Sequence, residues 1–426
     1  MKIMCLTEAY TPDINVGAIR IQEMVAVFAQ QKDTSVTVLV YNPQVNSKTS
    51  GRTAQQSGSV TIIRQEHRHL SRMLRVAQLV GILTVAYWVY LLLKEARRNK
   101  PDIVVASIPG LAPAAAAYLV SKALGFTICI DIRDDWLAPK FKNFVIRQLP
   151  WYAKLYGRLS YELSFLLFLQ ACKKALLVSA VYATILDGLK KIPGYRAPAI
   201  YVPNGVNLGE IGAIASPNRN KGAFAKYGIL DDGAKTIIFV GMLGGYYHPD
   251  ALIPALKQVN ENGIRLNYVV VGEGVLKNKI KADAEKEGIG DHVFTPGNLV
   301  HREVIDLLRA SDLAFYALDK DFPAADSALG VKILEYIACK LPILSISGED
   351  AVVAQIIHDK GIGITLGWNE LEHLGDAIRR MLEEDESTRH IEAYYPDFIA
   401  TYDRRTNNQR LYDKMREAYG LKKGGK

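Results

Sequence analysis

Short runs of apolar, mostly β-branched residues recur along the chain, with stretches of helical character between them. These runs cover residues 3–6, 36–41, 103–106, 127–132 and 175–179 in the first half, and residues 236–240, 268–271, 292–294, 313–317, 343–346 and 362–365 in the second half. They are apolar on both faces, as strands of a parallel sheet covered by helices must be. Their alternation with helices predicts an α/β fold, and the two series predict two doubly wound, Rossmann-like domains.

The two series meet at residues 201–207, where an apolar strand ends in a proline and an Asn-Gly turn. Such residues interrupt regular structure, so we expect the hinge here and place the domains at residues 1–205 and 206–399. Residues 396–419 carry aromatic and apolar side chains at roughly helical spacing. This spacing predicts a closing helix, and we expect residues 400–426 to pack back on the first domain.

Residues 76–93 form a nearly continuous apolar stretch with lysines and arginines on both sides. About 20 apolar residues cross a bilayer, so the stretch has the length of a marginal membrane span. A span would place strands of one sheet on opposite sides of the membrane, which argues against it. Tyr87, Trp88 and Tyr90 with the cationic flanks favour a helix in the membrane interface. A buried core helix of the first domain is the alternative.

A second segment supports the interfacial interpretation. Residues 140–158 combine lysines and arginines with Trp151, Tyr152 and Tyr156, ahead of an apolar run at 163–169. Each cation near an anionic leaflet contributes about 1 kcal/mol to binding. Residues 72–98 and 140–170 are therefore expected to meet an anionic membrane surface. The alternative is a set of solvated cations beside a buried helix.

The composition excludes several classes of protein. Of the 426 residues, 49% are hydrophobic and 23% are charged, which excludes a disordered scaffold, a collagen-like fibre and a small disulfide-stapled module. The 52 lysines and arginines against 44 aspartates and glutamates give a net charge of +8. Such a surface favours anionic partners. Much of the excess lies beside the apolar segments at 64–100 and 140–174, and no nucleic-acid motif occurs, so we expect a membrane surface and no nucleic acid.

The four cysteines are spread singly and flanked mostly by apolar residues, at Cys5, Cys129, Cys172 and Cys339. They are expected to be buried thiols in a reducing compartment. The apolar run before Glu8 is too short for a signal-peptide core. We therefore expect a cytoplasmic protein.

Loops after the predicted strands supply candidate anion sites, because helix N-termini point free N–H groups at ligands beyond the carboxyl ends of parallel strands. Gly17 and Arg20 follow the first strand. Gly-rich turns at 241–245 and 272–274 follow two strands of the second domain. None of them has the full GxGxxG spacing, so each could also be an ordinary tight turn.

Residues 327–343 are the most informative segment. Gly330 opens a predicted helix with Lys332 in its first turn, and Glu335 lies one turn further on. A helix N-terminus with a glycine and a lysine suits a diphosphate, and the carboxylate could accept hydrogen bonds from ribose hydroxyls. An ordinary amphipathic helix with a Lys–Glu pair is the alternative.

These pieces, in this order, resemble the retaining glycosyltransferases of family four. Residues 203–207 (PNGVN) are similar to the family's interdomain motif PNGVD. Residues 239–244 and 270–274 are similar to its first two strand-turns in the second domain, and residues 294–297 are similar to the turn that contacts the base. Residues 327–343 are similar to its Glu-x7-Glu helix and the turn that follows it. The resemblance covers nearly the whole chain. It implies the GT-B fold, in which two Rossmann-like domains face a central cleft.

The resemblance also implies roles for residues. Glu335 would bind the donor ribose, and backbone N–H groups near Gly330 and Gly17 would bind the diphosphate. The full set expected at the donor site is Gly17, Arg20, Asn204, Gly241, Gly244, Gly272, Glu273, Gly297, Gly330, Val331, Lys332 and Glu335.

The chain departs from the family pattern at three places. Ser327 replaces the first glutamate of Glu-x7-Glu, and Met242 and residues 246–248 replace two cations that would hold the diphosphate. Lys332 and Arg20 are the nearest replacements. The variant pattern resembles the subgroup that builds bacterial surface polysaccharides from N-acetylated amino sugars and acts on lipid-linked acceptors.

Residues 131–136 (DIRDDW) follow the same subgroup pattern. Arg133 and Asp134 are expected as acceptor-binding or catalytic residues of the first domain, together with Lys332 as the third catalytic residue. A salt bridge at a strand end is the alternative for Arg133 and Asp134.

The implied activity is the transfer of a sugar, an N-acetylated hexosamine, from a UDP-linked donor to a lipid-linked saccharide at the inner face of the cell membrane. Transfer with retention would proceed by front-face attack, with leaving-group charge stabilised by cations and helix N-termini and with no metal or other cofactor. Two alternatives stay open. One is a sugar-nucleotide epimerase of the same fold, and the other is an inactive, membrane-associated partner subunit.

Overall fold

The structure is a computed structural model that describes residues 1–11, 16–41, 51–66, 81–108, 110–138, 143, 146–147, 151, 154–213, 222–229, 233–322, 325–327, 329–384 and 386–424. The chain divides into two compact units. Unit 1 contains residues 1–204 and 404–426, and unit 2 contains residues 205–403.

Unit 1 is built on an eight-stranded sheet in the order β3-β4-β2-β1-β5-β6-β7-β8. Its strands are β1 (Lys2–Thr7), β2 (Ser35–Val40), β3 (Gly51–Ser57), β4 (Val60–Glu66), β5 (Ile103–Ile108), β6 (Thr127–Ile132), β7 (Leu177–Ala180) and β8 (Ala199–Tyr201). All neighbouring strands are parallel except β3 and β4. The strand order reverses between β1 and β5, as the doubly wound pattern requires.

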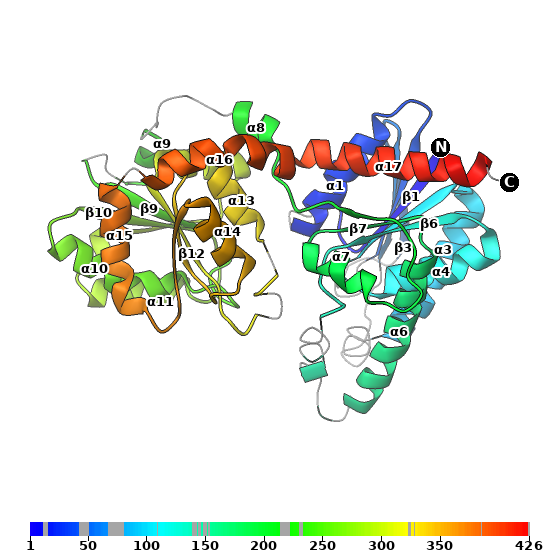
Figure 1. Cartoon of the computed structure of the whole chain (residues 1–426), viewed down its shortest axis with the longest axis horizontal. Coiled ribbons are helices and arrows are strands. Elements are labelled where there is room, and N and C mark those ends of the chain that lie inside the picture. The colour runs from blue at the N-terminus through cyan, green and yellow to red at the C-terminus, as the bar shows by residue number, and fades with distance from the viewer. Residues whose placement is uncertain are drawn as a thin grey trace. The chain divides into compact units, whose positions relative to one another are not determined.

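Helices cover both faces of this sheet (Figure 1). They are α1 (Val16–Ala29), α3 (Ile82–Asn99), α4 (Ala112–Leu124), α6 (Lys154–Lys174), α7 (Ala183–Lys190) and α17 (Arg404–Gly424). Strands β3 and β4 were not predicted. They form an antiparallel hairpin whose β3 sequence, GRTAQQS, is polar, whereas the prediction rested on apolar runs.

The apolar stretch at 76–93 overlaps α3, and residues 76–80 lie outside the described residues. Trp88 is fully buried with Leu91 and Leu92 in the main core of unit 1. Placing Trp88 in a membrane interface was therefore wrong, because its ring packs against Tyr41 at a centroid distance of 5.5 Å. Across the described residues, none of the helices combines the length and apolar character needed to cross a bilayer.

A buried ion pair joins helix α1 to strand β6 in unit 1. The Arg20 guanidinium on α1 donates from Nη2 to Asp131 Oδ1 at 2.7 Å and from Nε to Asp131 Oδ2 at 3.1 Å. It also donates to the carbonyl oxygens of Val202 and Pro203 at 3.0 and 3.1 Å, and its Nη1 lies 3.5 Å from Asn204 Oδ1. Arg20 is thus fully engaged within unit 1.

Two serines complete the environment of this carboxylate. Ser107 Oγ on β5 and Ser179 Oγ on β7 each donate to Asp131 at 2.8 Å. Burial by itself would raise the pKa of Asp131, but the charge and hydrogen bonds of Arg20 hold it below its usual value. The carboxylate therefore stays ionised and joins α1, β5, β6 and β7.

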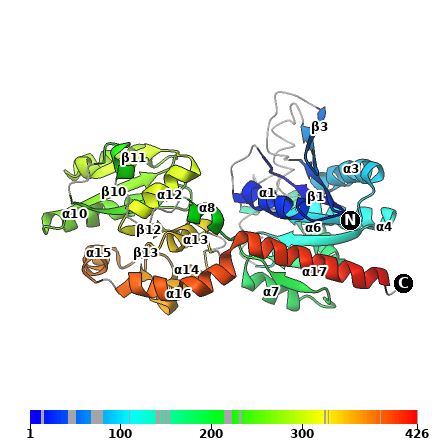
Figure 2. The ribbon, with the colours of Figure 1, turned by 90° about the horizontal axis from the view of Figure 1, so that it is seen from above.

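The C-terminal helix α17 belongs to unit 1 and lies beside α1 (Figures 1 and 2). Tyr412 is buried against Phe28 at a ring-centroid distance of 5.5 Å, and its hydroxyl lies 2.8 Å from Thr34 Oγ1. Near its end, Tyr419 donates to Asp102 Oδ1 at 2.8 Å. The helical region starts well ahead of Pro396, since α16 (Glu386–Tyr402) precedes α17 and belongs to unit 2.

Unit 2 contains a six-stranded parallel sheet in the order β11-β10-β9-β12-β13-β14. Its strands are β9 (Lys235–Val240), β10 (Leu266–Val271), β11 (Val293–Gly297), β12 (Leu313–Ala317), β13 (Ile343–Ile346) and β14 (Gly363–Leu366). The order reverses between β9 and β12, which places the ligand-binding crevice of a doubly wound sheet at their carboxyl ends.

The helices of unit 2 pack apolar faces against this sheet, in two clusters of buried residues. They are α8 (Leu208–Ala213), α9 (Gly222–Ala225), α10 (Ile253–Glu261), α11 (Lys277–Lys286), α12 (His301–Ala310), α13 (Val331–Ala338), α14 (Val352–Lys360), α15 (Leu374–Glu383) and α16. The four cysteines are free thiols, and Cys5, Cys129 and Cys172 are buried.

Removing one partner of the buried ion pair should strongly destabilise unit 1. Asp131→Ala leaves the Arg20 charge buried without a carboxylate, and such changes cost about 3–5 kcal/mol. We expect a large fall in the urea midpoint followed by circular dichroism. The matched control is Asp187→Ala, which removes an exposed carboxylate 2.8 Å from Lys190 and should leave the midpoint unchanged. Equal effects of the two substitutions would contradict this account.

Candidate functional site

Three loops meet at the carboxyl ends of β9, β10 and β11 in unit 2. Gly241 N–H donates to Val271 O at 2.8 Å, and Gly272 N–H donates to Gly297 O at 3.0 Å. Leu243 N–H donates to Glu273 O at 3.0 Å. These backbone hydrogen bonds stack the three loops against one another, so the predicted donor residues Gly241, Gly244, Gly272, Glu273 and Gly297 belong to one layer.

Two of these positions require glycine. Gly241 has a φ of 143° and Gly272 a φ of 138°, a region that residues with a Cβ rarely adopt. A Cβ at 272 would overlap the carbonyl oxygen of Gly241, and a Cβ at 241 would overlap the end of the Lys332 side chain. Glycine at 241 therefore lets the lysine lie directly against the backbone of the first loop.

Helix α13 brings the second group of predicted residues to the same edge. Gly330 is its N-cap and Val331 its first residue. Tyr336 fixes the helix to the sheet, since its hydroxyl accepts from Val240 N–H at 3.1 Å and donates to Phe315 O at 3.3 Å. The N-terminus of α13 is thereby held beside the loop after β9.

The Lys332 Nζ is buried and has no hydrogen-bond acceptor among the described residues. Its Nζ lies over the Tyr247 ring, 3.2 Å from the centroid, and 5.1 Å from the centroid of Phe239. Burial lowers the pKa of Lys332 to about 7, and the nearby Glu335 carboxylate opposes this only in part. An amine in such a site gains from any anion that reaches it.

Glu335 lies one turn beyond Lys332 and is linked to His301 at the start of α12. His301 Nε2 is 3.0 Å from Glu335 Oε1, and its Nδ1 is 3.3 Å from Glu210 Oε1 on α8. The hydrogen bond with Glu335 raises the pKa of His301 to about 9, with further support from Glu210. The imidazole therefore carries a positive charge at neutral pH.

A second cluster of charged side chains lies at the carboxyl ends of β1 and β6 in unit 1. Arg133 is buried, and its Nη1 donates to Gly17 O at 2.9 Å, while its Nε has no acceptor among the described residues. Burial raises the pKa of Glu8 to about 7 and that of Asp134 to about 6, and the charge of Arg133 opposes both shifts. Two carboxyl groups here can exchange protons near neutral pH.

The structure brings the predicted donor residues of unit 2 together: Gly241, Gly244, Gly272, Glu273, Gly297, Gly330, Val331, Lys332 and Glu335. Gly17, Arg20 and Asn204 lie in unit 1 instead. Arg20 and Asn204 belong to the buried cluster around Asp131, and Gly17 contacts Arg133. Among the described residues, no group of three or more side chains of metal-binding type is arranged to hold a metal ion.

Four residues of these sites were missed from the sequence. The sequence indicates Tyr247 only as the loss of a cation, whereas in the structure its ring lies against the Lys332 Nζ. Tyr336 and His301 gave no signal, because their partners are distant in sequence. Glu8 ends the first apolar run, and a carboxylate directly after a buried strand could have been selected as a candidate.

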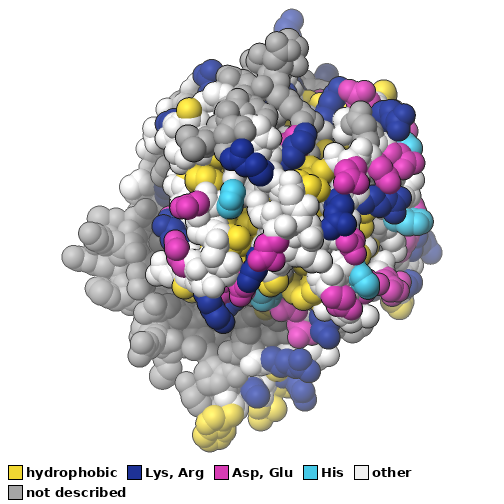
Figure 3. All heavy atoms as spheres, turned by 90° about the vertical axis from the view of Figure 1, so that its left-hand side faces the viewer, with side chains coloured by type: hydrophobic (Ala, Val, Ile, Leu, Met, Phe, Trp, Pro, Cys, Tyr) yellow, Lys and Arg dark blue, Asp and Glu magenta, His cyan; other side chains and the backbone are white. Residues whose placement is uncertain are grey.

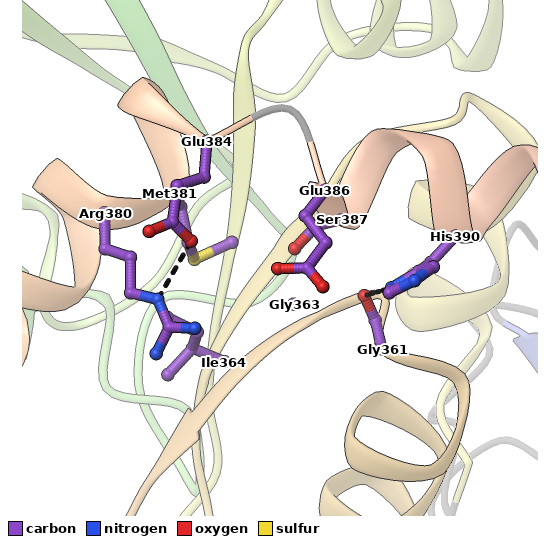
Figure 4. Close-up of a pocket in the computed structure, with 9 residues that line it drawn as sticks. All are labelled: Gly361, Gly363, Ile364, Arg380, Met381, Glu384, Glu386, Ser387 and His390. Carbon is purple, nitrogen blue, oxygen red and sulfur yellow. Dashed lines mark hydrogen bonds and ion pairs between the residues drawn. The ribbon is translucent and has the colours of Figure 1, made fainter.

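Unit 2 also contains a pocket of about 230 Å³ that is separate from these loops (Figure 4). It lies where β14 begins, at the edge of the sheet opposite the glycine loops. In it Arg380 donates to Glu384 at 3.0 Å, and His390 Nδ1 lies 3.2 Å from Gly361 O. Arg380 and Glu384 are thus paired with each other, and His390 is paired with a backbone carbonyl.

Burial of the Lys332 charge should cost stability. Lys332→Met replaces the amine with an apolar chain of similar length, so we expect a melting temperature above that of the wild type below pH 7. The pKa of Lys332 is about 7 in the folded protein, and its ordinary value is 10.5. Between pH 7 and 10.5 the unfolded chain therefore binds a proton that the folded protein does not. The melting temperature of the wild type should therefore rise relative to that of the variant as the pH increases through this range. Lys360→Met, at an exposed lysine over Tyr394, is the control and should show neither effect.

Comparison with known proteins gives a family-model match to one part of the chain. Residues 221–397, which lie within unit 2, match the family model of the glycosyl transferases group 1. A search of curated protein sequences gave no significant match.

Solved structures match over the whole chain. Sucrose-phosphate synthase from Thermosynechococcus elongatus has a TM-score of 0.71 at 13% identity, over 99% of both chains. WaaG, a glycosyltransferase involved in lipopolysaccharide biosynthesis, has a TM-score of 0.65 at 17% identity, over 97% of this chain and 99% of its own. Anabaena HepE in complex with UDP and glucose has a TM-score of 0.65 at 15% identity, over 98% of this chain and 100% of its own.

These similarities confirm the predicted GT-B fold with two Rossmann-like domains. Together, the fold and the group 1 match at 221–397 support a glycosyltransferase.

Proposed function

We propose that this protein is a retaining glycosyltransferase that moves a sugar from a UDP-linked donor to a lipid-linked saccharide. One observation carries the proposal. The Lys332 ammonium group is buried and has no acceptor among the residues that the structure describes, it lies against the glycine loop at the crevice of the second sheet, and it precedes Glu335 by one turn. A cation kept unpaired in such a site is poised for an anionic ligand.

The diphosphate contacts would come from unit 2. In the proposal, Lys332 Nζ and the free N–H groups at the start of α13 bind the diphosphate, and the Gly241 and Gly244 loop lets its oxygens approach the backbone. Glu335 accepts hydrogen bonds from the ribose hydroxyls. Arg20 is not assigned to this contact, because all its nitrogens already have protein partners.

UDP is the proposed nucleotide because HepE, of the same fold, is known in complex with UDP and glucose. An N-acetylated hexosamine is the proposed sugar on the subgroup resemblance alone. The absence of the first Glu-x7-Glu carboxylate at Ser327 is consistent with a sugar pocket that differs from that of other members.

The proposed reaction is front-face transfer, in which the acceptor hydroxyl attacks the anomeric carbon from the side the diphosphate leaves. Most of the stabilisation would be electrostatic, with the protonated Lys332 and the α13 N-terminus facing the charge that develops on the diphosphate. We further propose that Arg133, Asp134 and Glu8 of unit 1 bind the acceptor or relay its proton. No metal enters this scheme.

Donor binding tests the site assignment. Lys332→Ala and Glu335→Ala should each weaken UDP binding about 10- to 100-fold in calorimetry, because each removes hydrogen bonds that involve a charged group. Lys360→Ala also removes a lysine placed over a tyrosine ring, but at an exposed position of α14, and this variant should bind UDP as the wild type does. Wild-type affinity in both site variants would overturn the assignment, and no UDP binding by the wild type would favour the inactive-subunit alternative.

Acceptor dependence separates transfer from epimerisation. In the proposal, UDP is released from UDP-N-acetylhexosamine only when lipid-linked saccharide is added. Conversion of the donor into another sugar nucleotide without acceptor, detected by chromatography, would instead indicate the epimerase.

We also propose that unit 1 binds the inner face of the cell membrane through α6 and α3. Four leucines at spacings of four, four and three form an exposed row along α6: Leu155, Leu159, Leu163 and Leu166, with exposed fractions of 72%, 63%, 47% and 56%. On α3, Leu83 and Tyr90 are also exposed, and Ile82 N–H donates to Ser160 Oγ of α6 at 2.8 Å. Exposed apolar rows of this kind on adjoining helices are rare on monomeric surfaces without a partner.

The charge around this row fits anionic lipid. Helix α6 carries Lys154, Arg158, Lys173 and Lys174 against the one acidic residue Glu162. By contrast, Figure 3 shows a face of unit 2 on which basic and acidic side chains of the described residues are interspersed. Apolar burial and lipid attraction would therefore act together on α6.

Vesicle binding tests the membrane proposal. Wild-type protein should sediment with vesicles that contain phosphatidylglycerol, but not with pure phosphatidylcholine, and added salt should weaken binding. Replacing Leu155, Leu159 and Leu163 by serine should reduce binding at least about tenfold, because each leucine loses apolar burial. The control replaces the exposed Val275 and Val300 of unit 2 by serine. Equal loss in both variants, or binding without anionic lipid, would contradict the proposal.

A further inference from the structure

His301 bridges two carboxylates from different helices of unit 2. Its Nε2 lies 3.0 Å from Glu335 Oε1 on α13, and its Nδ1 lies 3.3 Å from Glu210 Oε1 on α8. A neutral imidazole has only one N–H and could donate to only one of them. Both contacts are favourable together when the ring is an imidazolium, which agrees with a pKa raised to about 9.

This bridge determines how Glu335 presents its carboxylate. Oε1 is occupied by His301, whereas Oε2 accepts no hydrogen bond from the described residues. The Glu335 side chain is 15% exposed and that of His301 is 44% exposed, so the pair is open to solvent. A glutamate held in one conformation loses less entropy when a ligand binds.

The fold of α12 has other supports. The N–H of Val300, just before the helix, donates to Glu303 Oε2 at 3.3 Å, and Arg309 near its end donates to Ile211 O of α8 at 3.0 Å. Val304, Leu307 and Leu308 are buried in the core. A partly exposed histidine at the first position adds little to this packing, so its two ionic contacts call for another explanation.

We propose that His301 is a positioning residue that holds the Glu335 carboxylate so that its free oxygen receives the ribose hydroxyls of a nucleoside diphosphate. The inference rests on the proposed function, since it takes Glu335 as the ribose-binding group. It adds a specific residue that acts through Glu335 and need not touch the ligand.

The test compares two probes on the full chain by calorimetry: UDP, and 2′,3′-dideoxy-UDP, which lacks the ribose hydroxyls. His301→Ala should weaken UDP binding about tenfold, as expected for loss of a charge-assisted hydrogen bond, and should change dideoxy-UDP binding less than about twofold. His301→Gln keeps one N–H donor and should restore part of the affinity for UDP. His358→Ala, at an exposed histidine of α14, is the control.

A double-mutant cycle shows whether His301 acts through Glu335. In a Glu335→Ala background, His301→Ala should have no further effect on UDP binding. An effect that persists in that background, or that is equal for the two probes, overturns the inference. Wild-type UDP affinity in a folded His301→Ala also overturns it but leaves the proposed function intact, whereas failure of the wild type to bind UDP overturns both.

Discussion

The ion pair between Arg20 and Asp131 is the contact on which unit 1 depends most. It joins α1 to the carboxyl end of β6, and the two serines extend the join to β5 and β7. The same guanidinium holds the carbonyl groups of Val202 and Pro203, where the chain is about to leave the unit. The buried charges are tolerated here because the three guanidinium nitrogens of Arg20 and the two serine hydroxyls all have acceptors.

Lys332 shows the opposite arrangement in unit 2. Its ammonium group is buried, as the Arg20 guanidinium is, but an aromatic ring and a glycine backbone lie against it in place of a carboxylate. The paired Arg20 stabilises the fold of unit 1. The Lys332 amine costs unit 2 stability and has no acceptor among the described residues. The contrast explains why two residues that the sequence pattern suggested as equivalent cations have different roles in the structure.

The fold class and most strands of both sheets were predictable, because strands buried on both faces are apolar throughout. The hairpin β3–β4 was not, since its polar β3 lies at a sheet edge and has no such run. The glycine loops and the start of α13 were also predictable from strand-to-helix spacing. The contacts of His301 and Tyr247 were not, because they depend on how separate helices pack. Trp88 was misplaced because an amphipathic helix with an aromatic face has the same sequence pattern in a core and at a membrane.

Helix α17 gives unit 1 a particular order of assembly. Its Leu411, Tyr412 and Met415 cover the apolar cluster around Phe28, yet they are synthesised after all of residues 205–403. Until α17 leaves the ribosome, that part of α1 is not covered by it, whereas residues 205–403 of unit 2 are already synthesised. Unit 1 is thus begun before unit 2 and completed after it, and its exposed apolar surface would persist while residues 205–403 are synthesised, as a target for chaperones.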